Sequence, residues 1–306
     1  MTDILLATYN GERFLREQLD SLFMQTYGDF KIIAHDDGST DGTLEILKEY
    51  QEKFPGKLNI IEDNISYKSS CKNFLNLIKY SDAEYVMFCD QDDVWLEEKV
   101  RVSVEAISEL ENSDGQKLPA MVSSGAMLAD ENMNEIVCDE TKLATYCPRT
   151  DFASLLVQNY FMGCTMIFNR ELARLVKTQA DYIEMHDWWV ALLAAGTGKI
   201  GVVDKKLMKY RQHGKNVVGA TDIKSAGYIA SKLNAAKLKE ACGNLLRQAQ
   251  SFKDCYYDVI TDENKKLLNM FCSLRKQNKI KRINTQLKYG FKKSTTARLI
   301  GQLMFM

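Results

Sequence analysis

Short apolar segments alternate with helical patterns through the first ninety residues. Residues 3–7, 30–34, 58–61 and 85–89 are short, mostly apolar runs with β-branched or aromatic side chains, and they predict buried strands. In each interval between them, apolar residues recur at steps of three and four, which predicts a helix. Strands that alternate with short helices are typical of a parallel sheet covered on both faces. The predicted fold class is therefore α/β with a mostly parallel sheet.

The pattern becomes mixed from residue 96 to about residue 215. It predicts one helix over residues 100–110 and another over residues 187–195. Strands are predicted near residues 120–122, 163–168 and 201–210. No linker rich in Pro or Gly interrupts this region, so we expect residues 1–219 to form one domain.

The last part of the chain has a helical pattern. Apolar and small residues recur at alternating steps of three and four from Tyr228 to Tyr256, which predicts a helix packed along one seam. A second helix is predicted from Leu267 to Leu287. We therefore expect residues 220–306 to form a helical C-terminal extension.

Polar clusters follow three of the predicted strands, at residues 8–10, 36–37 and 90–93. In parallel sheets, ligands bind beyond the carboxyl ends of the strands, so the three clusters predict a binding site. The last cluster holds Asp90, Asp92 and Asp93, whose charges repel one another and are costly to bury. A divalent cation that holds a diphosphate would compensate them, and the alternative is a solvated acidic loop.

The composition is that of a soluble globular protein, with 45% hydrophobic and 26% charged residues. No apolar run approaches the length of a membrane span, and the N-terminus has no basic segment of a secretory signal. The eight cysteines form no CxxC pair and have no His partner at metal-binding spacing. This pattern indicates a reducing, cytosolic setting without structural zinc.

The charge is unevenly distributed along the chain. Residues 264–306 hold 11 basic residues and no acidic residue, whereas residues 1–263 hold the other 29 basic residues and all 41 acidic ones. A basic tail on an acidic body predicts an anionic partner for the tail.

Five ordered motifs resemble those of the family 2 glycosyltransferases, enzymes of the GT-A fold that use nucleotide sugars. They lie at residues 6–10, 35–43, 90–93, 185–189 and 210–213. The segments DQDDVW, GCTMIF, HDWW and YRQH most resemble bacterial rhamnosyltransferases that build cell-wall rhamnans and O-antigens. The resemblance implies a GT-A domain with a nucleotide-binding half, residues 1–95, and an acceptor half, residues 96–219.

The resemblance also implies a set of residues that bind the donor. Tyr9 offers a ring face to a nucleobase, Asp37 is expected to accept the ring N–H of uracil or thymine, and Asp90 is placed near the ribose. The alternative is that Tyr9 and Asp37 form a turn around Gly38, and that Lys72 is only solvated. The implied donor-binding set is Ala7, Tyr9, Asn10, Asp37, Lys72, Asn73 and Asp90.

For the metal, the resemblance implies Mg²⁺ or Mn²⁺ held by Asp92, with His213 as a further ligand or phosphate contact. A structural His is the alternative at position 213. Asp93 is expected to cap the helix that follows it.

For catalysis, Asp187 is the implied general base for the acceptor hydroxyl, and a helix N-cap is the alternative. Trp95 and Trp188 are expected either to stack on the acceptor sugar or to pack in the core.

These features together predict an inverting, metal-dependent sugar transferase. The expected donor is dTDP-L-rhamnose, and the expected acceptor is a lipid-linked polysaccharide on the cytoplasmic face of the membrane. A UDP-hexose donor, or a non-catalytic subunit that binds nucleotide sugars, are the alternatives.

The basic tail is expected to dock peripherally on an anionic bilayer, with Leu299, Ile300, Leu303, Met304 and Phe305 as its apolar edge. A solvated helix face and a homodimer seam through the C-terminal helices are the alternatives. Nucleic-acid binding is not expected, because the motifs are those of a transferase.

Overall fold

The computed structural model describes residues 1–112, 117–136, 149–176, 180–213 and 235–306. The chain forms two compact units. The sheet unit consists of Met1–Cys138, Phe161–Lys177 and Lys199–Gly219. The helical unit consists of Asp139–Tyr160, Thr178–Gly198 and Ala220–Met306. The helical unit thus includes two segments that precede residue 219, in addition to the C-terminal region.

The first half of the sheet is parallel, as the sequence predicts. Its strands are β1 (Thr2–Thr8), β2 (Phe30–Asp36), β3 (Leu58–Ile60) and β4 (Tyr85–Cys89), in the spatial order β3-β2-β1-β4. All three pairings among these strands are parallel. The α/β fold class is therefore confirmed.

The second half makes the sheet mixed. It contains β5 (Val94–Trp95), β6 (Ala120–Ala129), β7 (Met166–Asn169) and β8 (Lys199–Arg211), in the order β7-β6-β8-β5. Strand β7 is antiparallel to β4 and β6, whereas β6 and β8 are parallel. The predicted strand at residues 163–168 is wrong for its first three residues, which form the 3₁₀ helix η2 (Gly163–Thr165).

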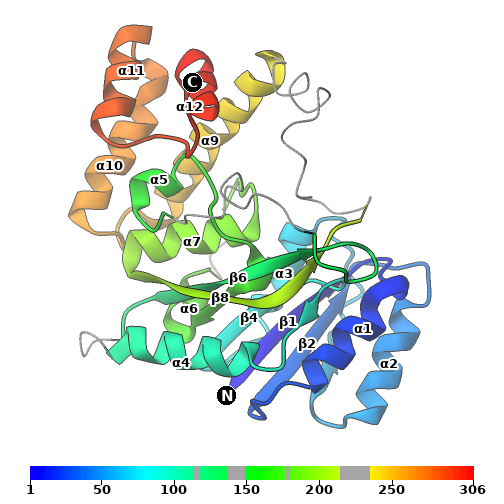
Figure 1. Cartoon of the computed structure of the whole chain (residues 1–306). Helices are drawn as coiled ribbons and strands as arrows, with labels where there is room; N and C mark the ends of the chain where they lie inside the picture. The colour runs from blue at the N-terminus through cyan, green and yellow to red at the C-terminus, as the bar shows by residue number, and fades with distance from the viewer. Residues whose placement is uncertain (113–116, 137–148, 177–179, 214–234) are drawn as a thin grey trace. The chain divides into compact units, whose positions relative to one another are not determined.

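Helices flank the sheet on both faces (Figure 1). The helices of this unit are α1 (Glu12–Phe23), α2 (Thr43–Lys53), α3 (Ser70–Ile78), α4 (Lys99–Asn112) and α6 (Arg170–Val176). Alternate β1 residues Ile4 and Leu6 share a core with Leu15 of α1 and Val100 of α4. On β4, the ring of Phe88 contacts Phe74 of α3. The strands are thus apolar on both faces because helices cover both.

The strand register brings the predicted polar clusters together. Thr8, the last residue of β1, is paired with Asp36, the last residue of β2. On its other side, Leu6 of β1 is paired with Cys89, the last residue of β4. The loops after β1, β2 and β4 therefore leave the sheet at one edge, with the loop after β1 in the middle.

The helical unit is all-α in its described part. It contains α5 (Phe152–Leu155), α7 (His186–Thr197), α9 (Ala235–Tyr256), α10 (Asp262–Ser273), η3 (Leu274–Lys276), α11 (Lys279–Lys288) and α12 (Thr296–Phe305). The predicted helix from Leu267 to Leu287 is two helices. Asn278 breaks it, because its side chain accepts the N–H of Lys281 and begins α11 as an N-cap. Residues 228–234 of the predicted seam lie outside the described residues.

The structure also bears on the expected absence of a membrane span and on the state of the cysteines. Within the described ranges, no helix is long and apolar enough to cross a membrane. The six cysteines in those ranges, Cys71, Cys89, Cys164, Cys242, Cys255 and Cys272, are free thiols.

Candidate active site

Tyr9 is presented to solvent at the end of β1. Its side chain is 55% exposed, although it follows a fully buried strand. The side chain of Gln91 holds its backbone in both directions: Tyr9 N donates to Gln91 Oε1 at 2.8 Å, and Gln91 Nε2 donates to Tyr9 O at 3.0 Å. A Cβ at Gly11 would lie 2.3 Å from Gln91 Oε1, so a larger residue at position 11 would displace the Gln91 amide. The loop after β4 therefore fixes the orientation of Tyr9.

The loops after β1 and β2 are also joined by side chains. Asn10 has a left-handed backbone, with φ of 48°, and its Oδ1 accepts the N–H of Thr40 at 2.9 Å. Asp36 accepts the hydroxyl of Thr8 at 2.8 Å and the N–H of Ser39 at 2.7 Å. Ala7 is buried within β1. This cross-linking leaves the ring of Tyr9 as the exposed feature of the first loop.

Asp37 is the first residue of the loop after β2 and is only 4% exposed. Its Oδ1 accepts the N–H groups of Tyr67 and Lys68, and its Oδ2 accepts the N–H of Ser69 at 2.9 Å. The carboxylate thus holds the loop that leads into α3. The base-binding role of Asp37 stays a prediction.

Asn73 and Lys72 have different surroundings at the start of α3. Asn73 is buried, and its amide bonds both His35 Nδ1, at 2.7 Å, and His35 O, at 3.2 Å. His35 in turn lies 3.0 Å from Asp63 Oδ1. Lys72 is exposed. Asn73 therefore joins α3 to β2, whereas Lys72 is a surface residue. A donor contact by either residue stays a prediction.

The predicted metal residues Asp92 and His213 lie together. His213 Nε2 is 2.7 Å from Asp92 Oδ2, and the side chains are 9% and 17% exposed, respectively. The His213 ring also contacts the ring of Phe14, with centroids 5.1 Å apart. Two residues from distant parts of the sequence thus bring an imidazole nitrogen and a carboxylate oxygen together, and their role as metal ligands stays a prediction.

Arg211 stands two positions before His213 and bonds the backbone of Asp92. Its side chain is 1% exposed and lies over the ring of Phe14, 4.4 Å from the centroid. Its Nε donates to the carbonyl of Asp92 at 2.7 Å, and its backbone N–H donates to Asp93 Oδ1 at 3.1 Å. The remaining guanidinium nitrogens bond the Glu131 carbonyl and the Glu17 carboxylate. Arg211 therefore ties the end of β8 to the acidic loop.

Asp93 is not the cap of the following helix, and that prediction is wrong. It is fully buried before β5, and α4 begins only at Lys99. Burial, together with the charges of Asp92 and Asp90, raises the pKa of its carboxyl well above the usual value. Its Oδ2 has no hydrogen-bond partner in the described part of the chain. Ligand atoms of Asp90, Asp93 and Cys164 all lie within 4.8 Å of one another.

Lys99 supplies a buried positive charge behind this cluster. It is fully buried, donates to the Cys164 carbonyl and lies 3.9 Å from the centroid of the Trp95 ring. Burial lowers the pKa of its amine to about 8. Trp95 itself is 2% exposed and belongs to the core of the sheet unit. An acceptor role for Trp95 stays a prediction.

Asp187 lies in the first turn of α7, in the helical unit. Met185, in an extended conformation, occupies the N-cap position, so Asp187 is not the N-cap residue. Its side chain is 9% exposed, and its Oδ1 accepts the N–H of Trp188 at 2.6 Å. The indole N–H of Trp188 donates to the Leu155 carbonyl at 2.7 Å. Burial lowers the pKa of the adjacent His186 to about 3, so that imidazole is neutral.

A family model described as "Glycosyl transferase family 2" matches residues 3–176, which is more than half of the chain. The chain belongs to this glycosyltransferase family. Its similarity to dTDP-rhamnosyl transferase RfbG of Shigella flexneri is 31% identity over 237 residues, which cover 70% of this chain and 74% of that protein.

Solved structures show the same fold as this glycosyltransferase. TarS 1–349 of Staphylococcus aureus in complex with UDP-GlcNAc aligns with a TM-score of 0.57 at 16% identity, over 99% of this chain and 90% of that chain. Mannosyltransferase PcManGT of Pyrobaculum calidifontis, in complex with GDP-Man and Mn²⁺, aligns with a TM-score of 0.54 at 14% identity, over 99% and 86% of the two chains. The GT-A fold is thereby confirmed.

Three residues that shape this site were not predicted from the sequence: Gln91, Lys99 and Arg211. Gln91 stands inside the acidic motif, but only the fold shows that its amide reaches the backbone of Tyr9. Arg211 stands inside the YRQH segment, two positions before His213, which is a signal that could have been used. A buried Lys99 gives no sequence signal, because it begins an ordinary amphipathic helix.

Proposed function

We propose that this glycosyltransferase transfers L-rhamnose from dTDP-β-L-rhamnose to a lipid-linked saccharide, with inversion and with Mg²⁺ or Mn²⁺ as cofactor. The observation that carries the proposal is the Asp92–His213 pair, 2.7 Å apart at the sheet edge where the loop of Tyr9 also emerges. The choice of donor is supported by the 31% identity with a dTDP-rhamnosyl transferase.

The residues at this edge fit a divalent cation. Carboxylate oxygen and imidazole nitrogen are both ligands of such ions, and neither side chain is fully exposed. The buried Asp93 carboxyl, one position after Asp92, has an oxygen with no hydrogen-bond partner among the described residues. Asp92 and His213 would hold the cation, which when bound stabilises the charge that develops on the leaving diphosphate.

The donor is bound by the loops after β1 and β2 in this proposal. Tyr9 stacks on the thymine base, since its ring is exposed and its backbone is fixed by Gln91. Lys72 is an exposed lysine, which suits a phosphate contact. Ala7, Asn10, Asp37, Asn73 and Asp90 complete the proposed donor-binding set.

Asp187 is the proposed general base. It accepts the proton of the acceptor hydroxyl while the hydroxyl oxygen bonds to the anomeric carbon. The bond between that carbon and the diphosphate oxygen breaks with its electron pair, so the configuration is inverted and no covalent enzyme intermediate forms. Burial keeps the neighbouring His186 neutral, so this imidazole places no positive charge beside the Asp187 carboxylate.

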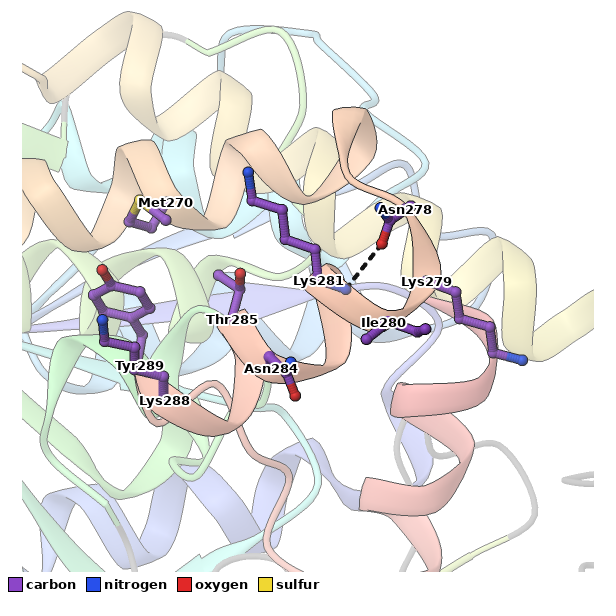
Figure 2. A pocket seen from close by; sticks show the side chains of 9 residues that line it. All are labelled: Met270, Asn278, Lys279, Ile280, Lys281, Asn284, Thr285, Lys288 and Tyr289. Carbon is purple, nitrogen blue, oxygen red and sulfur yellow. Dashed lines mark hydrogen bonds between the residues drawn. The ribbon is translucent and has the colours of Figure 1, made fainter.

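A lipid-linked acceptor agrees with the charge of the helical unit. Three lysines, Lys279, Lys281 and Lys288, line a hollow of about 730 Å³ at α10 and α11. Figure 2 shows Lys281 extended from α11 toward α10, with Lys288 and Tyr289 at the far end of α11.

Large apolar side chains are exposed on α11 and also on α12, including Ile280 on α11 at 75% and Met304 on α12 at 56%. Basic and apolar groups on one set of helices suit an anionic bilayer surface. We propose that these helices dock the enzyme peripherally at the cytoplasmic face of the membrane.

A donor screen tests the proposed function. The enzyme is incubated with Mn²⁺ or Mg²⁺ and with dTDP-L-rhamnose, UDP-glucose or UDP-galactose, and release of the nucleoside diphosphate is measured with and without a chelator. We expect metal-dependent consumption of dTDP-L-rhamnose in preference to the UDP-hexoses. Selective consumption of a UDP-hexose would refute the rhamnose assignment, and equal turnover in the chelator would refute the metal assignment.

A further inference from the structure

The segment that leads into α7 is bound to α9 through two of its backbone N–H groups. Tyr182 N donates to Ser251 Oγ at 2.9 Å, and Glu184 N donates to Gln248 Oε1 at 2.9 Å. Gln248 and Ser251 lie three positions apart on α9, are 2% and 4% exposed, and so face the same side of the helix. Asp187 follows Glu184 by only three residues.

These two bonds fix N–H groups that α7 itself cannot satisfy. The segment before the helix is extended, as the N-cap Met185 with ψ of 146° shows, so its N–H groups have no carbonyl partner within α7. Both N–H groups instead donate to side chains of α9, and this pairing joins the segment before α7 to that helix. The register of the first turn of α7 is thereby set by α9.

Side-chain contacts reinforce the same arrangement. The guanidinium of Arg247 lies 4.5 Å from the centroid of the Tyr182 ring, whose hydroxyl bonds the carboxylate of Glu184. One turn into α7, the Trp189 ring contacts Phe252 and Tyr256 of α9, with centroids 5.4 and 5.6 Å apart. The start of α7 is therefore fixed along its backbone and by its first buried ring.

The other end of α7 is also held by C-terminal residues. The amide of Asn264, on α10, donates to the carbonyls of Ala195 and Gly196 at 3.1 and 3.2 Å, which are among the carbonyls at the end of the helix. A Cβ at Gly196 would lie 3.0 Å from Ile260 Cγ2, so the helix approaches the α9–α10 connection closely at this point. The helix that carries Asp187 is thus held at both ends by residues after position 235.

We infer that Gln248 and Ser251 are positioning residues for Asp187, and that α9 is part of the catalytic apparatus. This inference rests on the proposed role of Asp187 as general base. Small displacements of a catalytic group reduce turnover strongly, whereas the proposed donor-binding residues lie in the sheet unit and α9 lies in the helical unit. The signature is therefore a loss of kcat with donor binding preserved.

The experiment compares Gln248→Met, Gln248→Glu and Ser251→Ala with the wild type. Methionine keeps the size of Gln248 but removes the acceptor, whereas glutamate keeps an oxygen that accepts the N–H of Glu184. Gln250→Met is the matched control, because Gln250 is exposed on the same helix and bonds Asp254 instead. For each variant, kcat and KM for the donor, nucleoside-diphosphate affinity by calorimetry and the thermal midpoint are measured.

We expect Gln248→Met and Ser251→Ala to lower kcat roughly tenfold to a hundredfold with unchanged nucleoside-diphosphate affinity. Gln248→Glu should restore most of the rate, and Gln250→Met should match the wild type. Wild-type kcat in a Gln248→Met/Ser251→Ala double variant, alongside an inactive Asp187→Asn enzyme, overturns the inference. Full activity of Asp187→Asn instead overturns the proposed base.

A merely structural role gives a different result. If Gln248→Met lowered the thermal midpoint and the nucleoside-diphosphate affinity together with kcat, and Gln248→Glu did not recover the rate, the positioning role would be wrong. Ser251→Ala removes only one oxygen, so it supplies the same comparison if Gln248→Met does not fold.

Discussion

The imidazole of His213 lies 2.7 Å from the carboxylate of Asp92, although 121 positions separate them in the chain. One residue follows β4 and the other follows β8, and Arg211 bonds the carbonyl of Asp92 just before the chain reaches His213. Their contact is thus a consequence of the sheet order and of one buried guanidinium, and it provides the basis for the first prediction.

Removal of either ligand should abolish metal-dependent donor binding. Asp92→Asn and His213→Gln keep the size of each side chain but weaken its bond to a cation, so the diphosphate loses its bridge to the protein. Calorimetric titration with the nucleoside diphosphate, with Mn²⁺ and with a chelator, measures the effect. The wild type should bind the nucleoside diphosphate more weakly when the metal is chelated, whereas the affinity of Asp92→Asn should be the same with and without the chelator. Equal wild-type affinity in both conditions contradicts the metal site.

Asp187→Asn should bind the donor normally but lose transfer. The amide keeps the shape of the carboxylate and removes its basicity, so turnover should fall on the order of a hundredfold or more. Initial rates at saturating donor and acceptor measure the loss, and calorimetry checks that donor affinity is retained. A rate near that of the wild type would show that Asp187 is not the base.

Arg211→Met should weaken both stability and metal-dependent binding. The substitution leaves the carbonyls of Asp92 and Glu131 without their buried donor, which we expect to cost about 3 kcal/mol of unfolding free energy. The Glu17 carboxylate is 57% exposed, so we assign no further loss to that ion pair. Urea denaturation and the calorimetric titration measure the two effects.

Arg13→Met is the matched control for Arg211. Its guanidinium lies over the same Phe14 ring, 4.7 Å from the centroid, but its side chain is 65% exposed. The control should change stability by less than about 1 kcal/mol and leave metal-dependent binding intact. Equal effects of the two substitutions would assign the role to the Phe14 ring and not to the buried hydrogen bonds.

His186 should make the enzyme less stable in acid. Its pKa is lowered from 6.5 to about 3 by burial, so below pH 6.5 the unfolded chain binds a proton that the folded chain does not. Stability from this group is therefore lost as the pH falls from 6.5 toward 3, by about 2 kcal/mol between pH 6.5 and 5. Urea denaturation of the wild type and of His186→Phe at pH 7 and pH 5 measures it. A pH dependence that is identical in both proteins contradicts the prediction.

The basic helices should bind anionic vesicles in a salt-dependent manner. Each lysine near an anionic surface contributes about 1 kcal/mol before screening, so Lys279→Gln, Lys281→Gln and Lys288→Gln together should weaken binding markedly. Co-sedimentation with phosphatidylserine vesicles across a salt series measures the affinity, which should fall as the Debye length shortens.

A control triple variant removes the same charge from the sheet unit, at the exposed residues Lys31, Lys48 and Lys79. It should bind vesicles like the wild type. Absence of vesicle binding by the folded wild type at low salt would refute docking. If the wild type instead formed a concentration-dependent dimer, the exposed apolar residues of α11 and α12 would be a contact surface for a second copy of the chain.

The parallel half of the sheet and its site edge could be predicted from local patterns. Apolar runs such as Tyr85–Cys89 are strands because their side chains are buried on both faces, and the polar residues after them mark the carboxyl ends. Asp92 and His213 were predicted together only through the resemblance to a family, and the structure brings them into contact.

Only the tertiary structure determines the hydrogen-bond partner of each polar residue in the site. Asp93 lies near a helix start in the sequence, but the antiparallel pairing of β5 with β8 brings the backbone of Arg211 to it, so it is buried as an acceptor and not as a cap. In the sequence, Gln248 and Ser251 are indistinguishable from other polar residues of an amphipathic helix. The fold brings the segment before α7 to them, and they accept its backbone N–H groups. The physical reason is that a hydrogen bond between distant segments depends on where the fold places both partners, whereas a strand or a helix depends largely on the residues within it.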